Sequence, residues 1–248
     1  HRMRTTAPTG MTVTPYSPEG SKREQVERMF DNISPKYDLL NRLFSLGIDQ
    51  GWRRKVVRLL GQEPVERLLD VATGTADLAI LGATRAKHVT GVDISEGMLA
   101  HGRTKVERKG LTQRVVLQRA DSAALPFADG TFDAVTVAFG VRNFEHLEQG
   151  LREMARVLRP NGRIFVLEFS KPTKAPMKQL FRFYFHRVMP AIGRTVSKDS
   201  AAYTYLPKSV DAFPEGQAFL DIMARAGLRE VKAEPLTGGI ATLYTGRR

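Results

Sequence analysis

The stretch LLDVATGTADLAI, residues 68–80, indicates a buried strand, a glycine turn and the start of a helix. Its apolar strand ends at Ala72, Gly74 lies in the turn, and a helical pattern begins at about residue 76. In a parallel sheet, ligands bind beyond the carboxyl ends of the strands, so residues 73–75 are expected at a binding site. A glycine loop of this kind is typical of three ligand classes: dinucleotides, nucleoside triphosphates and nucleoside sulfonium compounds.

Strands and helices alternate on both sides of this stretch. We expect strands over residues 67–72, 88–93, 114–121, 132–140, 162–170, 228–236 and 238–246, with a helix over 147–158. The alternation predicts an α/β fold, a Rossmann-like sheet of seven mostly parallel strands. A tight LTGG turn joins the last two strands, which are therefore expected to pair antiparallel. Before the first strand, helices are expected with breaks at Pro35 and Gly47.

The residues around the turn separate the three ligand classes. A triphosphate loop needs a Lys followed by Ser or Thr after its glycines, and TGTADL (73–78) contains neither pair. A dinucleotide loop needs three glycines, and here Gly74 stands alone. Asp70 and Asp77 would repel a pyrophosphate but attract a sulfonium and an α-ammonium group. The loop therefore favours S-adenosylmethionine as cofactor and a class I methyltransferase fold.

Two acidic residues end neighbouring strands. Asp93 ends the second strand, 19 residues after Gly74, where a carboxylate can accept both ribose hydroxyls. Asp121 ends the third strand and is placed to meet an adenine edge. Both belong to the predicted cofactor site.

Composition sets the wider limits. At 248 residues and 42% hydrophobic residues, the chain fits one α/β domain with a real core. The absence of cysteine excludes a thiolate zinc site, a disulfide and a cysteine nucleophile, and fits a reducing cytoplasm. No metal ion is expected, and no apolar run is long enough to span a membrane. The net charge of +12 favours an anionic partner: nucleic acid, a membrane face or an acidic ligand.

Six stretches of the chain together carry a family signature. They are FDNISPKYDLLNRLFSLGIDQGWR (30–53), LDVATGTADLA (69–79), GVDISEGML (91–99), LPFADGTFDAVTVAFGVRNF (125–144), VLEFSKP (166–172) and LTGGIATLYTG (236–246). The chain resembles the ubiquinone/menaquinone biosynthesis C-methyltransferases, a family that includes the demethylmenaquinone methyltransferases. The resemblance runs from about Val26 to Gly246. The glycine loop is generic, whereas PKYDLLN (35–41), FGVRN (139–143) and LEFSKP (167–172) together are specific to this family.

The resemblance implies cofactor contacts at Thr75 in the loop, at Asp93 for the ribose, and at Asp121 and Ser122 beside the adenine. Many members have glycine where this chain has Thr73 and Ala76, and some have a cofactor-contacting serine where it has Ala138. The full set of expected cofactor-binding residues is Asp70, Thr73, Gly74, Thr75, Asp77, Asp93, Ile94, Asp121 and Ser122.

The implied reaction is methyl transfer to a ring carbon of a reduced polyprenyl quinone, with demethylmenaquinol favoured over a benzoquinol. Such a carbon becomes nucleophilic when a ring hydroxyl is deprotonated or strongly hydrogen-bonded, and a fixed cation stabilises that oxyanion. Arg142, just after the fourth strand, is the candidate cation, and Asn143 orients it or the ring. Tyr37 is expected on a lid over the cofactor. These three are the candidate catalytic residues.

The domain plan has four parts. Residues 1–20 are expected to be mobile and 21–248 to form one methyltransferase domain, with a helical lid at 21–60 and an insertion over the substrate site at 171–213. Residues 171–198 contain seven Lys or Arg and no acid. A helix over 174–189 would place Lys174, Lys178 and Arg182 beside an apolar face of Met177, Phe181, Tyr184, Phe185 and Val188. That helix either makes transient contact with an anionic membrane or packs its aromatics on the core, and both can hold if only one edge of it is exposed.

Other functions stay open at this level. An RNA methyltransferase would suit the charge, but no RNA module or stacking motif is present, so no nucleic-acid partner is expected. Methylation of a small soluble phenol and a non-catalytic quinone-binding role are also compatible with the sequence. The expected location is cytoplasmic, at the inner face of the membrane if residues 171–198 touch it. The sequence indicates no oligomeric state.

Overall fold

Strand β1 (Val65–Val71) lies in the middle of a seven-stranded sheet in the computed structural model, which describes residues 12–196 and 198–248. The strand order is β3-β2-β1-β4-β5-β7-β6. The other strands are β2 (Ala86–Asp93), β3 (Val115–Arg119), β4 (Phe132–Ala138), β5 (Leu158–Phe169), β6 (Arg229–Leu236) and β7 (Ala241–Arg247). β1 pairs in parallel with β2 and β4, whereas β7 runs antiparallel to both β5 and β6. The predicted sheet, with its antiparallel final hairpin, is confirmed.

Helices cover both faces of this sheet. The helices are α1 (Lys22–Ile33), α2 (Tyr37–Ser45), α3 (Ile48–Leu60), α4 (Asp77–Gly82), α5 (Glu96–Arg108), α6 (Leu147–Val157), α7 (Met177–Phe183), α8 (Met189–Val196), α9 (Ser200–Ala212) and α10 (Gln217–Arg225). The chain also contains three short 3-10 helices, η1 (Ser34–Lys36), η2 (Val141–Asn143) and η4 (Thr237–Gly239), among the described residues. A π-helical turn, η3 (Tyr184–Val188), joins α7 to α8. The predicted helix at 147–158 is confirmed as α6.

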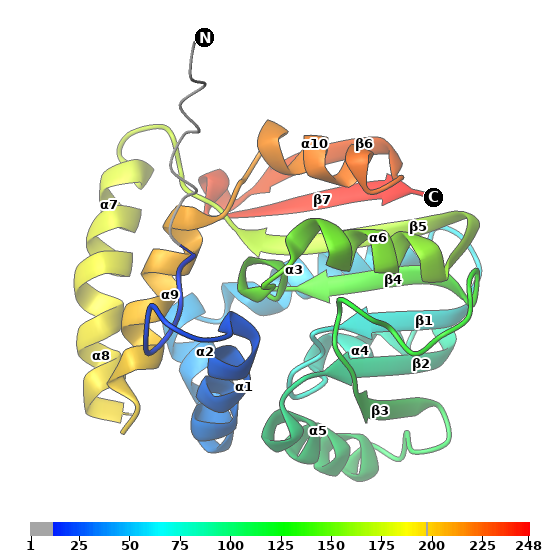
Figure 1. Cartoon of the computed structure of the whole chain (residues 1–248), viewed down its shortest axis with the longest axis horizontal. Helices are drawn as coiled ribbons and strands as arrows, with labels where there is room; N and C mark the ends of the chain where they lie inside the picture. The colour runs from blue at the N-terminus through cyan, green and yellow to red at the C-terminus, as the bar shows by residue number, and fades with distance from the viewer. Residues whose placement is uncertain (1–11, 197) are drawn as a thin grey trace, which may run out of the picture.

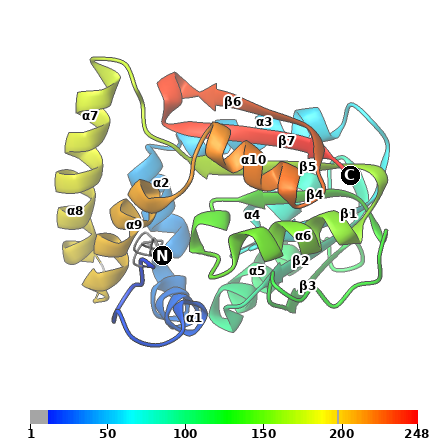
Figure 2. The ribbon, with the colours of Figure 1, turned by 45° about the horizontal axis from the view of Figure 1, so that its top comes forward.

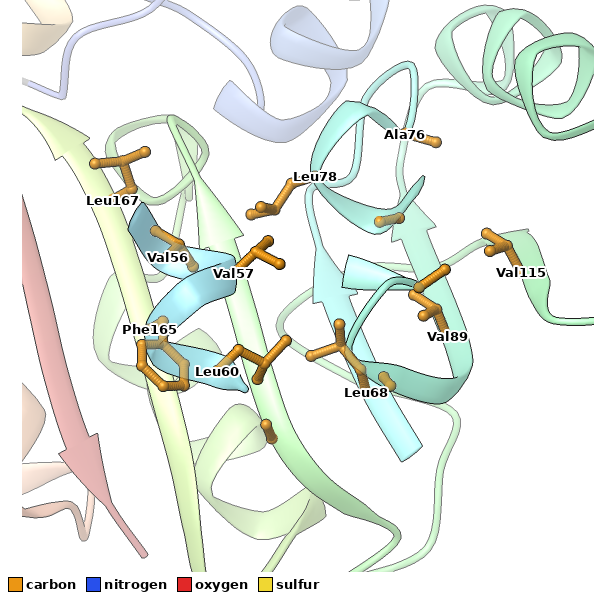
Figure 3. Close-up of a cluster of buried hydrophobic side chains, with 14 of the residues drawn as sticks. Val56, Val57, Leu60, Leu68, Ala76, Leu78, Val89, Val115, Phe165 and Leu167 are labelled. Carbon is orange, nitrogen blue, oxygen red and sulfur yellow. The ribbon is translucent and has the colours of Figure 1, made fainter. Parts of the chain in front are cut away.

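The core has two layers because successive side chains of a strand point to opposite faces. Leu68 and Leu69 of β1 are both completely buried. Leu68 packs in a cluster with residues of α3, α4 and α5, such as Leu60 and Leu78, as Figure 3 shows. Leu69 packs in a second cluster with α6 and α10, including Met154. The sheet is therefore buried on both faces, as its apolar strands predict.

A third group of helices stands at the carboxyl ends of the parallel strands. In Figure 1 the arrowheads of β4 and β5 point toward α1, α2, α7, α8 and α9, while β7 points away. Figure 2 shows the same helices gathered beside the sheet rather than on its faces. Val26, Leu40 and Tyr203 form the buried core that joins α1, α2 and α9. This cover lies over the crevice where the strand order reverses, between β1 and β4.

The expected lid at 21–60 is too long by one helix. The chain does break at Pro35 and Gly47, as predicted, and Gly47 takes a left-handed φ of 76° there. After that turn, α3 leaves the cover and packs on the sheet, where Val57 and Leu60 are buried in the first core cluster. Within residues 21–60, α1, η1 and α2 therefore belong to the cover, whereas the apolar side of α3 packs on the sheet.

The first residues that the structure describes already make contacts. Val13 and Tyr16 pack against the core of the cover, and Tyr16 hydrogen-bonds Asp199 at the start of α9. Gln25 of α1 accepts hydrogen bonds from the backbone of residues 16 and 17. The segment expected to be mobile up to residue 20 thus includes residues that are bonded to α1 and α9. Its first eleven residues lie outside the described part of the chain.

The expected helix over 174–189 differs from the structure in its bounds and in its buried face. It begins at Met177, after Pro176, which suits a helix start because it has no N–H to lose. It passes through the π-helical turn η3 into α8 and so reaches Val196. Phe181 and Phe185 are buried, and the ring of Phe185 lies 5.6 Å from that of Phe169. These two aromatics pack on the core, which was one of the two predicted arrangements, while Met177, Tyr184 and Val188 are half-buried.

Candidate functional site

Two cavities lie under the cover and share one wall. The first contains about 810 Å³ of empty space at the ends of β1, β2 and β4, its open mouth included. The second contains about 730 Å³ and lies between α1, α2, α9 and the ends of β4 and β5. Phe30, Tyr37 and Phe139 line both. Molecules in the two cavities would meet at these three rings.

The glycine loop forms one edge of the first cavity. Gly74 has a φ of 58°, and an added Cβ would lie 3.3 Å from Met98 Cε, so glycine keeps the backbone open to the cavity here. The Gly74 N–H donates to Asp93 Oδ2 at 2.8 Å, and the Ser95 N–H donates to Asp93 Oδ1 at 2.9 Å. Asp93 therefore ties the loop after β1 to the start of α5. Each of its oxygens retains a lone pair for a ligand hydroxyl.

The charge of the first cavity favours a cation. Its acidic lining residues are Asp93, Asp121 and Glu145, while Arg23 lies 2.7 Å from Asp121 as an ion pair (Nε–Oδ2). Burial raises the pKa of Asp93 to about 6, although backbone N–H groups that bond the carboxylate lower it. At neutral pH the cavity thus carries negative charge, which suits a sulfonium and opposes a pyrophosphate.

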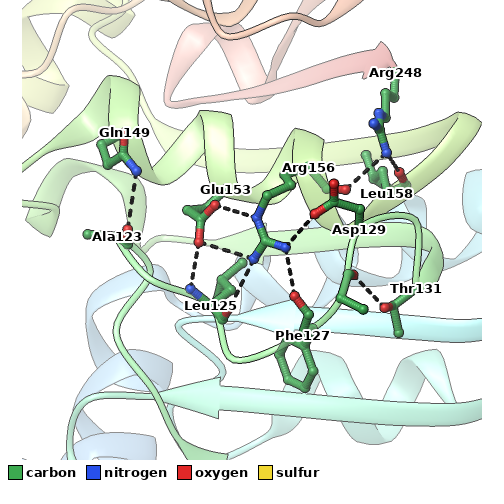
Figure 4. Close-up of polar contacts among 11 residues, drawn as sticks. Ala123, Leu125, Phe127, Asp129, Thr131, Gln149, Glu153, Arg156, Leu158 and Arg248 are labelled. Carbon is green, nitrogen blue, oxygen red and sulfur yellow. Dashed lines mark hydrogen bonds and ion pairs between the residues drawn. The ribbon is translucent and has the colours of Figure 1, made fainter.

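Asp121 and Ser122 reach the first cavity on the loop after β3. This loop is held against α6 by Arg156, which donates to the carbonyls of Leu125 and Phe127 at 2.9 and 2.7 Å and pairs with Glu153, as Figure 4 shows. The Ala123 N–H donates to Asp121 Oδ1 at 2.9 Å and closes a local turn. A loop without regular structure is therefore held in place by charge-assisted hydrogen bonds.

Four of the expected cofactor-binding residues do not line either cavity. Asp70 lies beneath the loop, where Thr73 and Thr136 each donate a hydroxyl hydrogen bond of 2.7 Å to its carboxylate. Thr75 donates to Asp38 of α2 at 2.6 Å. Asp77 points to Lys105, whose Nζ lies 2.6 Å from its Oδ1. These side chains brace the loop from below and outside, and Lys105 offsets the charge of Asp77. Gly74, Asp93, Ile94, Asp121 and Ser122 do line the first cavity.

The second cavity is walled mainly by apolar and aromatic side chains. These are Met29, Phe30, Ile33, Tyr37, Leu40, Phe44, Phe139, Phe169, Met189, Ala202, Tyr203, Tyr205 and Leu206. Its charged residues are Arg142 beside β4 and the pair Asp49–Arg53 of α3. Phe139, at the end of β4, has a left-handed φ of 57°, an uncommon conformation for a bulky residue that points to a functional constraint.

Arg142 is a buried cation fixed by a buried carboxylate. Its Nη1 donates to Glu168 Oε1 at 2.9 Å and to the Phe139 carbonyl at 2.8 Å, and its Nε donates to Ser209 at 3.2 Å. Glu168, near the end of β5, is completely buried. Nη2 makes no hydrogen bond to any described residue, and the side chain lines the second cavity. A guanidinium stays protonated, so this group supplies positive charge rather than acting as a base.

Tyr37 lies at the boundary between the cavities, and Asn143 lies on the side of the first cavity. Asn143 is buried, lines the first cavity and accepts a 2.9 Å hydrogen bond from the Tyr205 hydroxyl of α9. Tyr37 begins α2 and lines both cavities. Burial raises the pKa of Tyr37, so its hydroxyl stays neutral. The three candidate catalytic residues are thus gathered around one boundary.

Several residues of the site were not expected from the sequence. The sequence contains one indication that Glu168 is functional, because this single carboxylate interrupts the apolar run IFVLEF (164–169). Phe139 belongs to the FGVRN motif but has no property that marks a left-handed backbone. Tyr205 and the pair Asp49–Arg53 come from helices distant in sequence, and only the packing of the cover brings them to the cavity. Among the described residues, no group of three acids or histidines is placed to hold a metal ion.

Comparisons with known proteins bear on this site. A sequence model described as the ubiE/COQ5 methyltransferase family matches residues 19–248. The chain is 48% identical over 238 residues to the demethylmenaquinone methyltransferase of Bacteroides fragilis, covering 95% of this chain and 97% of that protein. It is 46% identical over 230 residues to the ubiquinone/menaquinone biosynthesis C-methyltransferase UbiE of Geotalea daltonii, covering 92% and 97%.

Solved structures share the fold. A Thermotoga maritima protein described as a SAM-dependent methyltransferase and "possible histamine N-methyltransferase" aligns with a TM-score of 0.61. The alignment covers 89% of this chain and 98% of that chain, at 18% identity, a level at which the likeness concerns the fold. The predicted class I methyltransferase fold is confirmed.

The buried Asp70 predicts a pH dependence of stability. Burial raises its pKa to about 6, above the value of about 3.9 of an exposed aspartate. Between these values the folded chain holds a proton that the unfolded chain has lost, so this group adds stability as the pH falls. Relative to Asp70→Asn, the free energy of unfolding of the natural protein should rise by about 1 kcal/mol from about pH 7 to about pH 5. Urea titrations of both proteins measure this difference, and a decrease would contradict the assignment.

Proposed function

Since the chain belongs to the ubiE/COQ5 methyltransferase family, we propose that it methylates a ring carbon of a reduced polyprenyl quinone with S-adenosylmethionine as methyl donor. Demethylmenaquinol is the proposed substrate, because relatives 46–49% identical over most of the chain include several named demethylmenaquinone methyltransferase. The observation that carries the proposal is the pair of cavities that meet at Phe30, Tyr37 and Phe139. Methyl transfer is an in-line displacement and needs donor and acceptor in contact.

The first cavity fits the cofactor. Gly74 leaves space that a Cβ would narrow, and Asp93 offers lone pairs to two ribose hydroxyls while it holds the loop. Ile94, Asp121 and Ser122 line the same cavity and would surround the adenine. When bound, S-adenosylmethionine supplies a methyl group whose carbon is the electrophile, because it is attached to a positively charged sulfur that leaves as a neutral thioether. The acidic lining of the cavity stabilises that charge, since Arg23 is paired with Asp121 and His146 lies beside Glu145.

The second cavity fits an aromatic ring with an apolar tail. Its apolar lining excludes water, and Arg142 supplies a fixed cation for a ring oxygen that gains negative charge. Glu168 and the Phe139 carbonyl hold the guanidinium in one orientation, so little reorganisation accompanies the reaction. Methyl transfer would exchange the carbon–sulfur bond for a carbon–carbon bond, and the proton that the ring carbon gives up would pass to solvent at the open mouth of the first cavity. Asn143 and Tyr37 position the ring at the boundary.

The place of the reaction follows from the substrate. A polyprenyl quinol is dissolved in a bilayer, and none of the described helices is long and apolar enough to cross one. We propose that the enzyme works from the cytoplasm and meets its substrate at the inner face of the membrane, with residues 171–198 taking part in the contact.

A direct assay tests the reaction. The purified protein is mixed with S-adenosylmethionine and chemically reduced demethylmenaquinone, and the quinone is analysed by mass spectrometry. We expect one added methyl group on the ring, with S-adenosylhomocysteine formed in equal amount. The same assay with a tail-less phenol and with RNA tests the two competing substrate classes. Methylation of RNA at a comparable rate, or cofactor binding without any turnover, would refute the proposal.

Asp93 is expected to control cofactor affinity. Asp93→Ala removes both the ribose acceptor and the carboxylate that holds the Gly74 and Ser95 N–H groups, so the Kd of S-adenosylmethionine should rise about a hundredfold. Asp77→Ala is the matched control, since that carboxylate faces Lys105 outside the cavity and its loss should change the Kd about twofold at most. Isothermal titration calorimetry measures both. Equal effects of the two substitutions would contradict the assignment of Asp93.

Arg142 is expected to control turnover rather than cofactor affinity. Arg142→Lys keeps a positive charge beside Glu168 but cannot bond Phe139, Ser209 and a ring oxygen together, so kcat should fall about a hundredfold. The Kd of the cofactor should stay within about threefold, because Arg142 does not line the first cavity. Arg163→Lys is a control at another buried arginine, which bonds the Leu59 and Leu60 carbonyls and should affect stability but not kcat. Normal turnover of Arg142→Lys would remove the residue from the mechanism.

A further inference from the structure

Exposed large apolar side chains are concentrated in one region of the described chain. There are seven of them, and six lie on α2, on α7, or between the end of α2 and the first residue of α3. These six define the α2–α7 patch: Leu39, Leu43, Leu46, Ile48, Leu180 and Phe183. Leu46 is 76% exposed and Phe183 is 64% exposed, values at which such side chains make little contact with their own protein. The seventh, Val116, lies on β3 at the opposite edge of the sheet. Clustering of this kind marks an interaction surface.

Helix α2 separates this patch from the second cavity. Leu40 and Phe44, four residues apart, face the cavity, and Leu40 is 2% exposed. Leu39 and Leu43, also four residues apart, are exposed on another side of the helix, and Leu46 is exposed in the left-handed turn that ends it. One helix therefore presents an apolar face to the substrate cavity and a second apolar face to the outside.

Helix α7 adjoins the exposed side of α2. The Tyr184 hydroxyl, directly after α7, donates to the Phe44 carbonyl at 2.9 Å. Leu180 is four residues before Tyr184 and so lies on the same side of the helix, with Phe183 beside it. Figure 2 shows α7 beside α2, in agreement with this hydrogen bond, and α7 lies at the end of the molecule away from β3. The apolar side chains of the two helices therefore face outward as neighbours.

The surroundings of the patch are positively charged. Lys174, Lys178, Arg182 and Arg187 are exposed on or next to α7, and Arg42 is exposed on α2. Of the ion pairs among described residues, the one that involves α7 or η3 joins His186 to Asp211 at 3.4 Å (Nε2–Oδ2). The basic side chains thus remain available for an external anion. Apolar side chains inside a basic rim match the acyl and phosphate layers of an anionic lipid surface.

We infer that the α2–α7 patch docks the enzyme on an anionic bilayer. Leu43, Leu46 and Phe183 enter the acyl region, and Lys178 and Arg182 contact lipid phosphates. The inference rests on the proposed function, because a substrate dissolved in the bilayer gives this arrangement its use. A quinol leaving the membrane would need to pass only α2 to reach the second cavity. The membrane contact expected at residues 171–198 thus extends to α2. Phe181 and Phe185 are buried and do not belong to the patch.

Vesicle binding without cofactor or substrate tests the surface alone. The natural protein is sedimented with vesicles of phosphatidylglycerol and phosphatidylcholine in equal parts, and with vesicles of phosphatidylcholine. We expect binding to the first kind, weakening as salt is added because the phosphate contacts are screened. The combined substitution Leu43→Gln, Leu46→Gln and Phe183→Gln should lower the partition coefficient at least about tenfold. Lys178→Glu with Arg182→Glu should abolish the preference for phosphatidylglycerol.

Controls separate docking from folding and from catalysis. Val116→Gln removes a similarly exposed apolar side chain outside the patch and should leave vesicle binding unchanged. All variants should keep the natural Tm and the natural affinity for S-adenosylmethionine. The triple variant should methylate a short-tailed, water-soluble demethylmenaquinol at the natural rate, but a long-tailed one in vesicles with a KM raised about tenfold.

The outcomes are distinguishable. Vesicle binding that is absent, or that persists in the triple variant, overturns the docking surface. A dimer that the triple variant converts to monomer, without vesicle binding, shows that the patch joins two copies of the chain and also overturns it. Vesicle binding through the patch with no methylation of either quinol overturns the proposed function and leaves the lipid surface standing.

Discussion

The ion pair between Arg142 and Glu168 is the interaction on which the site depends. It places a permanent cation in an apolar cavity, where an isolated charge would be too costly to bury. Glu168 comes from β5, Arg142 from the turn after β4, and Ser209, the third partner, from α9. The pair therefore joins the sheet to the cover that closes the second cavity. Buried pairs contribute little net stability after desolvation, so the reason for this one lies in orientation and chemistry.

Three aspartates near the glycine loop show how environment assigns different roles to one side chain. Asp70 is buried under the loop and accepts hydrogen bonds from two threonine hydroxyls. Asp93 is also buried but lines the first cavity, where its carboxylate joins two backbone N–H groups. Asp77 is exposed and paired with Lys105. The charge argument for a sulfonium still stands, but Asp93, Asp121 and Glu145 carry it instead of Asp70 and Asp77.

One helix of the cover contacts both cavities and also forms part of the outer surface. This helix, α2, begins with Tyr37 at the boundary of the two cavities, continues with Leu40 and Phe44 over the substrate cavity, and turns Leu43 outward. Any movement of α2 would change the boundary, the cavity and the external surface together. Lys105 of α5 holds its first turn through Asp38, at 2.8 Å (Nζ–Oδ2). The glycine loop and the cover thus meet at one polar contact, where Thr75 also bonds Asp38.

The sequence by itself determined the sheet and the cofactor loop, because both follow from local periodicity. It also determined that Asp93, Asp121 and Arg142 lie at or just after strand ends, because the carboxyl ends of parallel strands meet at one edge of a sheet. It also identified α7 as basic and aromatic. Only the tertiary structure decided which aromatics of α7 are buried and that α3 packs on the sheet. It also decided that Tyr205 and Asp49 line the second cavity and that Glu168 lies buried behind Arg142. Those outcomes depend on contacts between segments far apart in the chain. The periodicity and spacing of residues in the sequence do not indicate which face of a helix packs against which other segment.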